Sequence, residues 1–141
     1  MTLTKTYNFK QVATIFNGHE ISGFAEGTGI VVTRDEDAFT LTVGSSGEPV
    51  RSKSNNKSGT MTITLLQSSD SNAILSGLAE LDELSGGGQG PFLVKDNSGG
   101  SLAVAESAWV QKKPAAEYAA ESGNREWVFR TGNLSHFIGG N

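Results

Sequence analysis

Apolar residues and threonines alternate in two segments of this chain, residues 39–43 and 60–65. Successive side chains of a β-strand point to opposite faces, so each segment is predicted to form a strand with one apolar face and one threonine face. We expect the apolar faces to pack inward. The apolar positions are Phe39, Leu41, Val43, Met61, Ile63 and Leu65. The threonine positions are Thr40, Thr42, Thr60, Thr62 and Thr64.

Short apolar runs separated by turn residues predict further strands on both sides of these segments. Up to residue 43, runs at 12–16, 21–24 and 30–32 are divided by Asn17-Gly18 and Gly27-Thr28-Gly29, which fits three short strands with tight turns. Past residue 90, runs at 92–94, 102–110 and 125–130 predict more strands. Trp109 and Trp127 lie in these later runs beside apolar neighbours, which favours packing in the core over a role as exposed contact residues.

One amphipathic helix is predicted at about residues 70–85. Residues 69–72 supply several N-cap candidates, and Gly86 is a natural stop. The apolar side chains share one stripe at helical spacing, so we expect the helix to cover one face of a sheet. They are Ile74, Leu75, Leu78, Leu81 and Leu84.

A long polar stretch, residues 44–59, separates the two alternating segments and is predicted to be a long β-hairpin loop. It is too long for a tight turn, and Val50 is its one aliphatic residue. Two interpretations remain open: a flexible solvated loop, or a docking arm that becomes ordered only against a partner. The candidate contact residues of such an arm are Arg51, Lys53, Asn55 and Lys57.

Composition limits the protein class. The chain has 141 residues with 18 glycines, and its 11 basic and 15 acidic residues give a net charge of -4. This length predicts one domain over residues 1–141, and the glycine content favours a turn-rich β protein. The acidic balance argues against a protein that grips nucleic acid by its phosphates. No cysteine is present, which excludes disulfides and cysteine-bound zinc, and no apolar run is long enough to span a membrane.

Catalytic motifs are absent, and we expect no catalytic, cofactor-binding or metal-binding residue and therefore no enzyme. The two histidines, His19 and His136, are interpreted as surface or edge residues. The glycine-containing segments at 27–29 and 86–90 lack the spacing of a dinucleotide or phosphate loop. The acidic triplet at 35–37 is interpreted as a solvated turn, because it lacks the alternating ligands of a calcium loop.

Several blocks, in their order along the chain, resemble the tail tube proteins of contractile-tailed bacteriophages. The glycine run at 86–90 has no counterpart in that pattern. The blocks that carry the resemblance are Tyr7-Asn8-Phe9-Lys10, Thr42-Val43-Gly44 with Gly47-Glu48, Lys57-Ser58-Gly59-Thr60, Ser71-Asn72-Ala73 with Leu75-Ser76, Glu126-Trp127-Val128-Phe129, and Ile138-Gly139-Gly140.

This resemblance implies a mainly β subunit, sandwich-like or barrel-like, with one flanking helix. Six subunits would close into a ring, and stacked rings would form the inner tube through which phage DNA is ejected without specific binding. It further implies a location in the virion tail after assembly in the host cytoplasm. The partners would be other copies of the chain, the sheath, tape measure, baseplate and terminator proteins. Two alternatives remain: a tube protein of a tailocin or secretion tube, and a monomeric β-sandwich that binds carbohydrate or peptide.

Within such a tube, we expect the threonine faces to line a lumen of neutral to negative potential. We expect the loop at 44–59 to become ordered between stacked rings. Its basic residues would then meet carboxylates of an adjoining subunit, either at 35–37 or at Glu80 and Glu83 of the helix.

Overall fold

The computed structural model describes residues 4–140, which form a mainly β structure with one α-helix in this range. This confirms the fold class predicted from the sequence. Most of the strands fall where the hydrophobic pattern predicts them, whereas β2, β5 and β10 have no counterpart in that prediction. The predicted strand at 21–24 is wrong, since within it only Phe24 forms an isolated bridge, with Leu65. The elements are η1 (Phe9–Gln11), β1 (Val12–Phe16), β2 (His19–Glu20), β3 (Ile30–Arg34), β4 (Phe39–Val43), β5 (Pro49–Lys53), β6 (Gly59–Leu66), α1 (Ser71–Ser85), β7 (Gly90–Asp96), β8 (Leu102–Lys112), β9 (Asn124–Thr131) and β10 (Leu134–Phe137).

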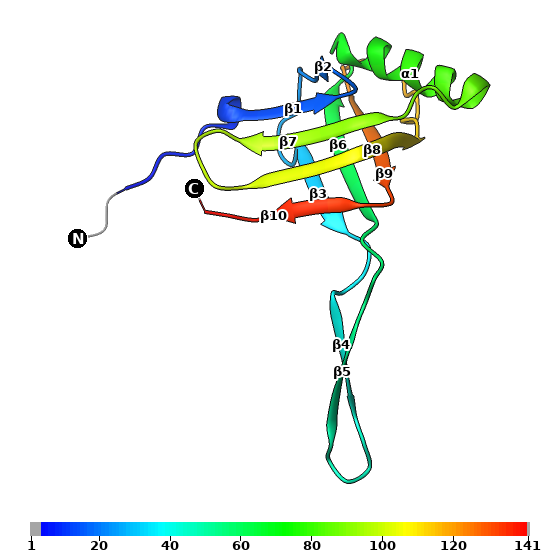
Figure 1. The fold of residues 1–141 in the computed structure, drawn as a ribbon. Coiled ribbons are helices and arrows are strands. Elements are labelled where there is room, and N and C mark those ends of the chain that lie inside the picture. The colour runs from blue at the N-terminus through cyan, green and yellow to red at the C-terminus, as the bar shows by residue number, and fades with distance from the viewer. Residues whose placement is uncertain (1–3, 141) are drawn as a thin grey trace.

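Eight strands form one antiparallel sheet that folds over into two layers (Figure 1). Its order is β2-β1-β7-β8-β9-β6-β3, and β10 pairs with β8 beside this path. The long strand β8 makes the corner, since residues 102–105 pair with β10 whereas residues 108–112 pair with β9 on the same edge. β1, β7, β8 and β10 therefore lie in one layer and run across β9, β6 and β3 in the other.

The core lies between these two layers. On β6, Met61, Ile63 and Leu65 are fully buried, as the alternation predicts. β9 buries Trp127 and Phe129 by the same period of two. Core packing is thus confirmed for Trp127 but wrong for Trp109, which is half-buried on β8 beside Arg130. The phenyl rings of three strands meet at the centre with centroids 4.9 to 5.8 Å apart, which suits edge-to-face and tilted packing. They belong to Phe16, Phe92 and Phe129.

Helix α1 lies near the ends of β6 and β9, where the indole Nε1 of Trp127 donates a 2.9 Å hydrogen bond to Asn72 Oδ1. The predicted helix range is confirmed, but the predicted apolar stripe is only partly right. Ser71, Leu75 and Ala79 are buried. The other flank of the stripe is exposed, because the helix meets the sheet along the narrow line that these residues, spaced by four, form. The exposed residues are Ile74, Leu81 and Leu84, the last at 87%.

The glycine run after the helix is a close-packed connection. Gly86 ends α1 in the left-handed conformation, with φ 73°, and donates its N–H to the Asp82 carbonyl. A side chain at Gly88 would collide with the Leu78 carbonyl, and one at Gly90 with the side chain of Asn17. The run therefore allows the chain to turn tightly from the helix into β7.

Strands β4 and β5 form a two-stranded ribbon, here called the arm (residues 39–53), that projects away from the sheet (Figure 1). The prediction that residues 39–43 pack their apolar face inward is therefore wrong, since Phe39, Leu41 and Val43 are 45%, 70% and 58% exposed. The alternation is real, but both strands stand outside the sheet. The arm turns at Gly47, whose positive φ of 89° suits a hairpin loop and whose N–H donates to the Gly44 carbonyl.

Candidate assembly surfaces

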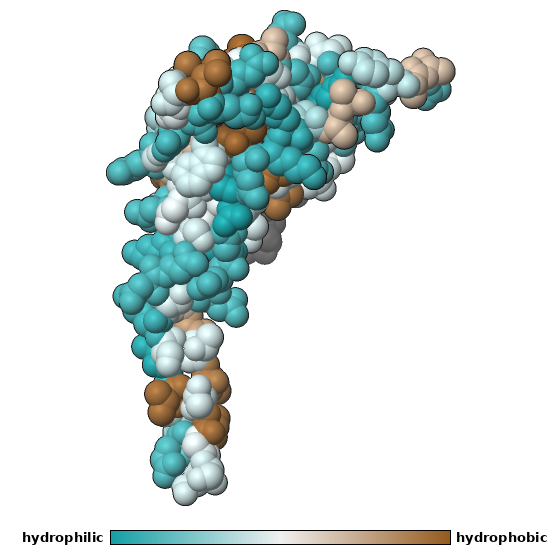
Figure 2. Space-filling model, turned by 90° about the vertical axis from the view of Figure 1, so that its right-hand side faces the viewer, coloured by the Kyte–Doolittle hydropathy of each residue, from teal (hydrophilic) through white to brown (hydrophobic). Residues whose placement is uncertain are grey.

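The two faces of the arm differ in chemistry because cross-strand partners share a face. Pairing of Phe39 with Lys53, Leu41 with Arg51 and Val43 with Pro49 puts these residues together on one side. The other side pairs Thr40 with Ser52 and Thr42 with Val50. We call the first side the apolar face of the arm. Figure 2 shows hydrophobic side chains gathered toward the outer half of the arm, beyond a polar stretch that joins it to the body.

That polar stretch, here called the stalk (residues 35–38 and 54–58), is held by a hydrogen-bond network around Asp35. The Asp35 carboxylate accepts bonds from Ser58 Oγ at 2.8 Å, Thr60 Oγ1 at 2.7 Å and Arg130 Nη2 at 2.6 Å. The hydrogen bonds from Thr60 and Ser58, followed by the charge of Arg130, hold the pKa of Asp35 below its usual value. Residues 35–37 are exposed, as a solvated turn predicts, but Asp35 also binds within its own subunit.

The four candidate contact residues of the polar stretch are divided between arm and stalk. Arg51 and Lys53 lie on the apolar face of the arm, and the Arg51 guanidinium stands 4.2 Å from the centre of the Phe39 ring. Asn55 and Lys57 lie in the stalk, where the Lys57 carbonyl accepts a 2.8 Å bond from the N–H of Leu134. The structure therefore brings together only the first pair.

The candidate lumen threonines also belong to two surfaces. Thr60, Thr62 and Thr64 are half-buried on the face of β6 that points away from the core. Cross-strand pairing puts Arg130, Val128 and Glu126 of β9 beside them. Thr40 and Thr42 lie instead on the polar face of the arm. The alternation alone could not show this separation, because the two segments have the same pattern.

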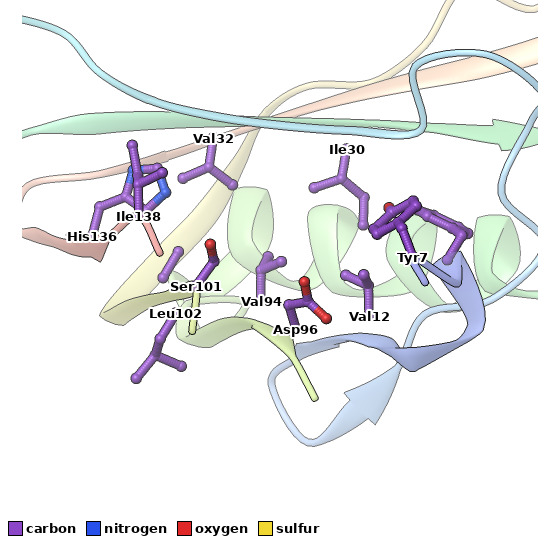
Figure 3. A pocket seen from close by; sticks show the side chains of 12 residues that line it. Tyr7, Val12, Ile30, Val32, Val94, Asp96, Ser101, Leu102, His136 and Ile138 are labelled. Carbon is purple, nitrogen blue, oxygen red and sulfur yellow. The ribbon is translucent and has the colours of Figure 1, made fainter. Parts of the chain in front are cut away.

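A groove of about 310 Å³ opens between the two layers where the core residues end. Figure 3 shows side chains of β3 facing those of β1 and β7 across it, with Tyr7 at one end and His136 and Ile138 at the other. Aliphatic side chains predominate, and Asp96 and Ser101 are polar residues of the lining. The aliphatic residues of the walls are Val12, Ile30, Val32, Val94 and Leu102.

Charged residues surround the His136 end of this groove. Burial and the nearby charge of Arg34 lower the pKa of His136. Arg34 is anchored, since its Nε and Nη2 donate to the Leu134 carbonyl at 3.1 and 2.7 Å. Glu36 and Asp37 line a depression that adjoins the groove and shares His136 with it.

The described residues contain no group of three or more histidine, cysteine or acidic side chains that could hold a metal ion. In the same part of the chain, no helix combines the length and the apolar character needed to cross a membrane. The arm and the groove present exposed apolar side chains and are therefore candidate contact surfaces.

Sequence comparison identifies relatives along nearly the whole chain. The model of the bacteriophage PhiTE tail tube protein family matches residues 4–139. Structural protein ORF10 of Pseudomonas phage KPP10 is 33% identical over 146 aligned positions, which cover 98% of this chain and 84% of that protein.

Solved structures share the fold at low sequence identity. A chain of the sheath/tube terminator of the extracellular contractile injection system PVC, in its extended state, has a TM-score of 0.63 at 9% identity, with 97% of this chain and 100% of that chain covered. A chain of the anti-feeding prophage cap, which terminates the tube, gives 0.59 at 6% identity over 97% and 94%. A chain of a native gene transfer agent virion gives 0.58 at 15% identity over 94% and 100%.

Proposed function

The chain belongs to the bacteriophage PhiTE tail tube protein family, a family of structural proteins and not of enzymes, and from this membership we propose that it forms the inner tube of a contractile phage tail. As one domain over residues 1–141, it would close into hexameric rings that stack into the conduit for DNA ejection. The observation that carries this proposal is the family match over residues 4–139.

Ring closure would use the edges of the sheet. β3 ends the strand order on one side. On the other side, β2 pairs with Ile15 and Phe16 of β1, and the N–H of Ile21 donates to the Thr14 carbonyl, so the open edge of β1 begins before Thr14. Open strand edges favour association with other chains, and pairing between neighbours around a ring would cover them. A contact between two different edges is heterologous, so it suits a ring of identical subunits.

The threonine face of β6 would line the lumen in this arrangement. Its hydroxyl groups are uncharged, so they would neither hold nor strongly repel passing phosphates. Arg130 on the adjoining strand is already paired with Asp35, and Glu126 adds a carboxylate beside Thr64. Such a surface is neutral to negative and would let DNA slide without specific binding.

Stacking of the rings would use the arm, which extends beyond the body as an inter-ring contact should. The sheath, tape measure, baseplate and terminator proteins would complete the tail, with assembly in the host cytoplasm and a final place in the virion.

A tailocin or secretion tube is the alternative closest in mechanism, and the fold shared with injection-system caps and terminators is compatible with it.

Negative-stain electron microscopy of the purified protein tests this proposal. We expect rings and stacked tubes at high protein concentration. Dispersed particles of monomer size under all conditions that assemble related tubes would contradict it and favour a monomeric binding module. Cross-sections with a symmetry other than sixfold would contradict the proposed hexameric ring but not the proposed tube.

A further inference from the structure

Two apolar surfaces of the same chain lack cover within the described residues: the apolar face of the arm and the groove between the layers. Leu41 and Val43 are 70% and 58% exposed on the arm. Tyr7 and Ile138, at the two ends of the groove, are 60% and 75% exposed. Exposed apolar side chains gathered in this way mark contact sites.

The arm cannot cover the groove of its own subunit. It projects away from the body (Figure 1), and the Asp35 network holds its stalk to β6 and β9. A second molecule must therefore supply the partner of each surface.

Charge indicates which molecule this is. The arm carries Arg51 and Lys53 on its apolar face and Glu48 at its turn, so two cations and one carboxylate leave one net positive charge on an acidic protein. At the groove, the Asp96 carboxylate, which accepts two bonds from Ser98, forms part of the lining. The adjoining depression adds two further carboxylates and one arginine, so three carboxylates and one cation leave two net negative charges at the groove and the depression together. These groups are Glu36, Asp37 and Arg34.

We propose that the groove of one subunit receives the apolar face of the arm of a second copy. Phe39, Leu41 and Val43 would enter between the β3 wall and the β1–β7 wall, and Arg51 and Lys53 would lie toward the carboxylates. Each copy offers one arm and one groove, so the contact is heterologous and propagates from ring to ring. This inference rests on the proposed tube function and names the receiving site of the arm.

Cysteine crosslinking tests the contact, because the chain has no native cysteine. The double variant L41C/I138C places one thiol on the apolar face and one at the groove mouth. T40C/I138C is the matched control, since Thr40 is the adjacent residue on the opposite face. Each variant is assembled under reducing conditions and then treated with a short bismaleimide.

We expect at least tenfold more interchain ladder from L41C/I138C than from T40C/I138C in tubes, and no such ladder from dispersed subunits. Equal ladders, or none from L41C/I138C within intact tubes, would overturn the groove as receiver and leave the tube function standing. Failure of the unmodified protein to assemble would instead contradict the tube function and would show in microscopy before any crosslinking.

If the cysteine variants do not assemble, hydroxyl-radical footprinting of unmodified tubes decides. Joint protection of Leu41, Tyr7 and Ile138 on assembly supports the contact. Protection of Leu41 with Tyr7 and Ile138 unchanged overturns it.

Discussion

Arg130 Nη2 lies 2.6 Å from Asp35 Oδ2, and this contact joins strand β9 to the stalk of the arm. The same carboxylate accepts hydrogen bonds from Ser58 of the stalk and from Thr60 of β6. One side chain thus ties together the two connections of the arm and the sheet from which it extends. We infer that Asp35 sets the direction in which the arm projects.

Replacing Asp35 with asparagine is expected to lower the free energy of unfolding by about 1 kcal/mol. The amide keeps one acceptor oxygen but loses the charge that strengthens the bond to Arg130, and partly exposed ion pairs contribute roughly 0.2–1 kcal/mol. Urea unfolding measures the change. Asp37→Asn, in the same segment, should alter the unfolding free energy by less than ~0.5 kcal/mol. Equal effects of the two substitutions would argue against a special role of Asp35.

The difference in unfolding free energy between the parent and Asp35→Asn should also depend on pH. Because the folded state lowers the pKa of Asp35 from 3.8, the unfolded chain binds the proton more readily. The stabilisation is therefore complete above the unfolded pKa and is lost as the pH falls through the lower folded pKa. Unfolding curves between pH 2.5 and 6 test this, and a constant difference throughout would contradict it.

The lowered pKa of His136 predicts a second loss of stability as the pH falls, in a pH range above that of Asp35. Its folded pKa lies below its ordinary value of 6.5, so the unfolded chain binds more protons in this window. Stability is complete above pH 6.5 and falls as the pH drops through the folded pKa. His136→Gln should remove this slope, and His19→Gln on the exposed strand β2 should retain it. The charged groups near His136 are Arg34, Glu36, Asp37 and Asp96. Variants of these four residues are not used as controls, because they would change the charge around His136 itself.

The bond from Trp127 to Asn72 predicts a cost of about 1–3 kcal/mol for Asn72→Ala, because the indole N–H would lose its acceptor in a buried side chain. Asn72 also donates to the carbonyls of Leu66 and Ser69. Alanine favours helices, so intrinsic propensity opposes the loss. Glu80→Ala on the exposed face of α1 is the control. Equal urea midpoints for Asn72→Ala and the parent would show that this bond contributes little.

The sequence predicted the core well where an apolar face had a sheet to pack against. Met61, Ile63 and Leu65 alternate with threonines and are fully buried. Phe39 and Leu41 show the same alternation and are exposed. The period of two determines which side chains share a face, but it does not determine what covers that face. A signal was nonetheless present, because polar segments at 35–37 and 54–58 flank residues 39–53 on both sides.

Long-range pairings account for most of what the sequence left open. Asp35 and Arg130 are 95 positions apart, and only the register of β3, β6 and β9 brings them together. Strand β10 is four residues long, with Leu134 as its buried residue, and so lacks a visible alternation. The groove combines wall residues from β1, β3 and β7, so the sequence of no single one of these strands reveals it.

The proposed lumen predicts how Thr62→Cys responds to thiol reagents. In dispersed subunits, small and polymer-linked maleimides should both react. In tubes, we expect the small reagent to react and the polymer-linked one to be excluded from the narrow channel. Glu80→Cys on α1 serves as an outer-surface control. Reaction of Cys at position 62 with both reagents in tubes would contradict the lumen position, and reaction with neither would indicate a subunit interface.

Removal of the arm gives the sharpest test of stacking. The N–H of Ser54 donates a 2.8 Å bond to the Ala38 carbonyl, so a two-residue Asn-Gly turn can replace residues 39–53 without moving the stalk. The body should keep its unfolding free energy within about 1 kcal/mol, since the arm contributes nothing to the core cluster. Tube formation, measured by sedimentation and microscopy, should be lost. If tubes form as readily as those of the parent, the arm is a solvated extension with no role in stacking.

Single substitutions on the arm separate its apolar contacts from its charges. Burial of one leucine side chain is worth ~1.5–3 kcal/mol, whereas an exposed ion pair contributes ~0.2–1 kcal/mol. Leu41→Ser should therefore raise the protein concentration needed for tube assembly by about tenfold or more, and Arg51→Gln by about fivefold or less. Thr42→Ser, on the polar face, is the matched control and should leave that concentration nearly unchanged. If Arg51→Gln is the more damaging variant, the charge of Arg51 contributes more to stacking than the burial of Leu41 does.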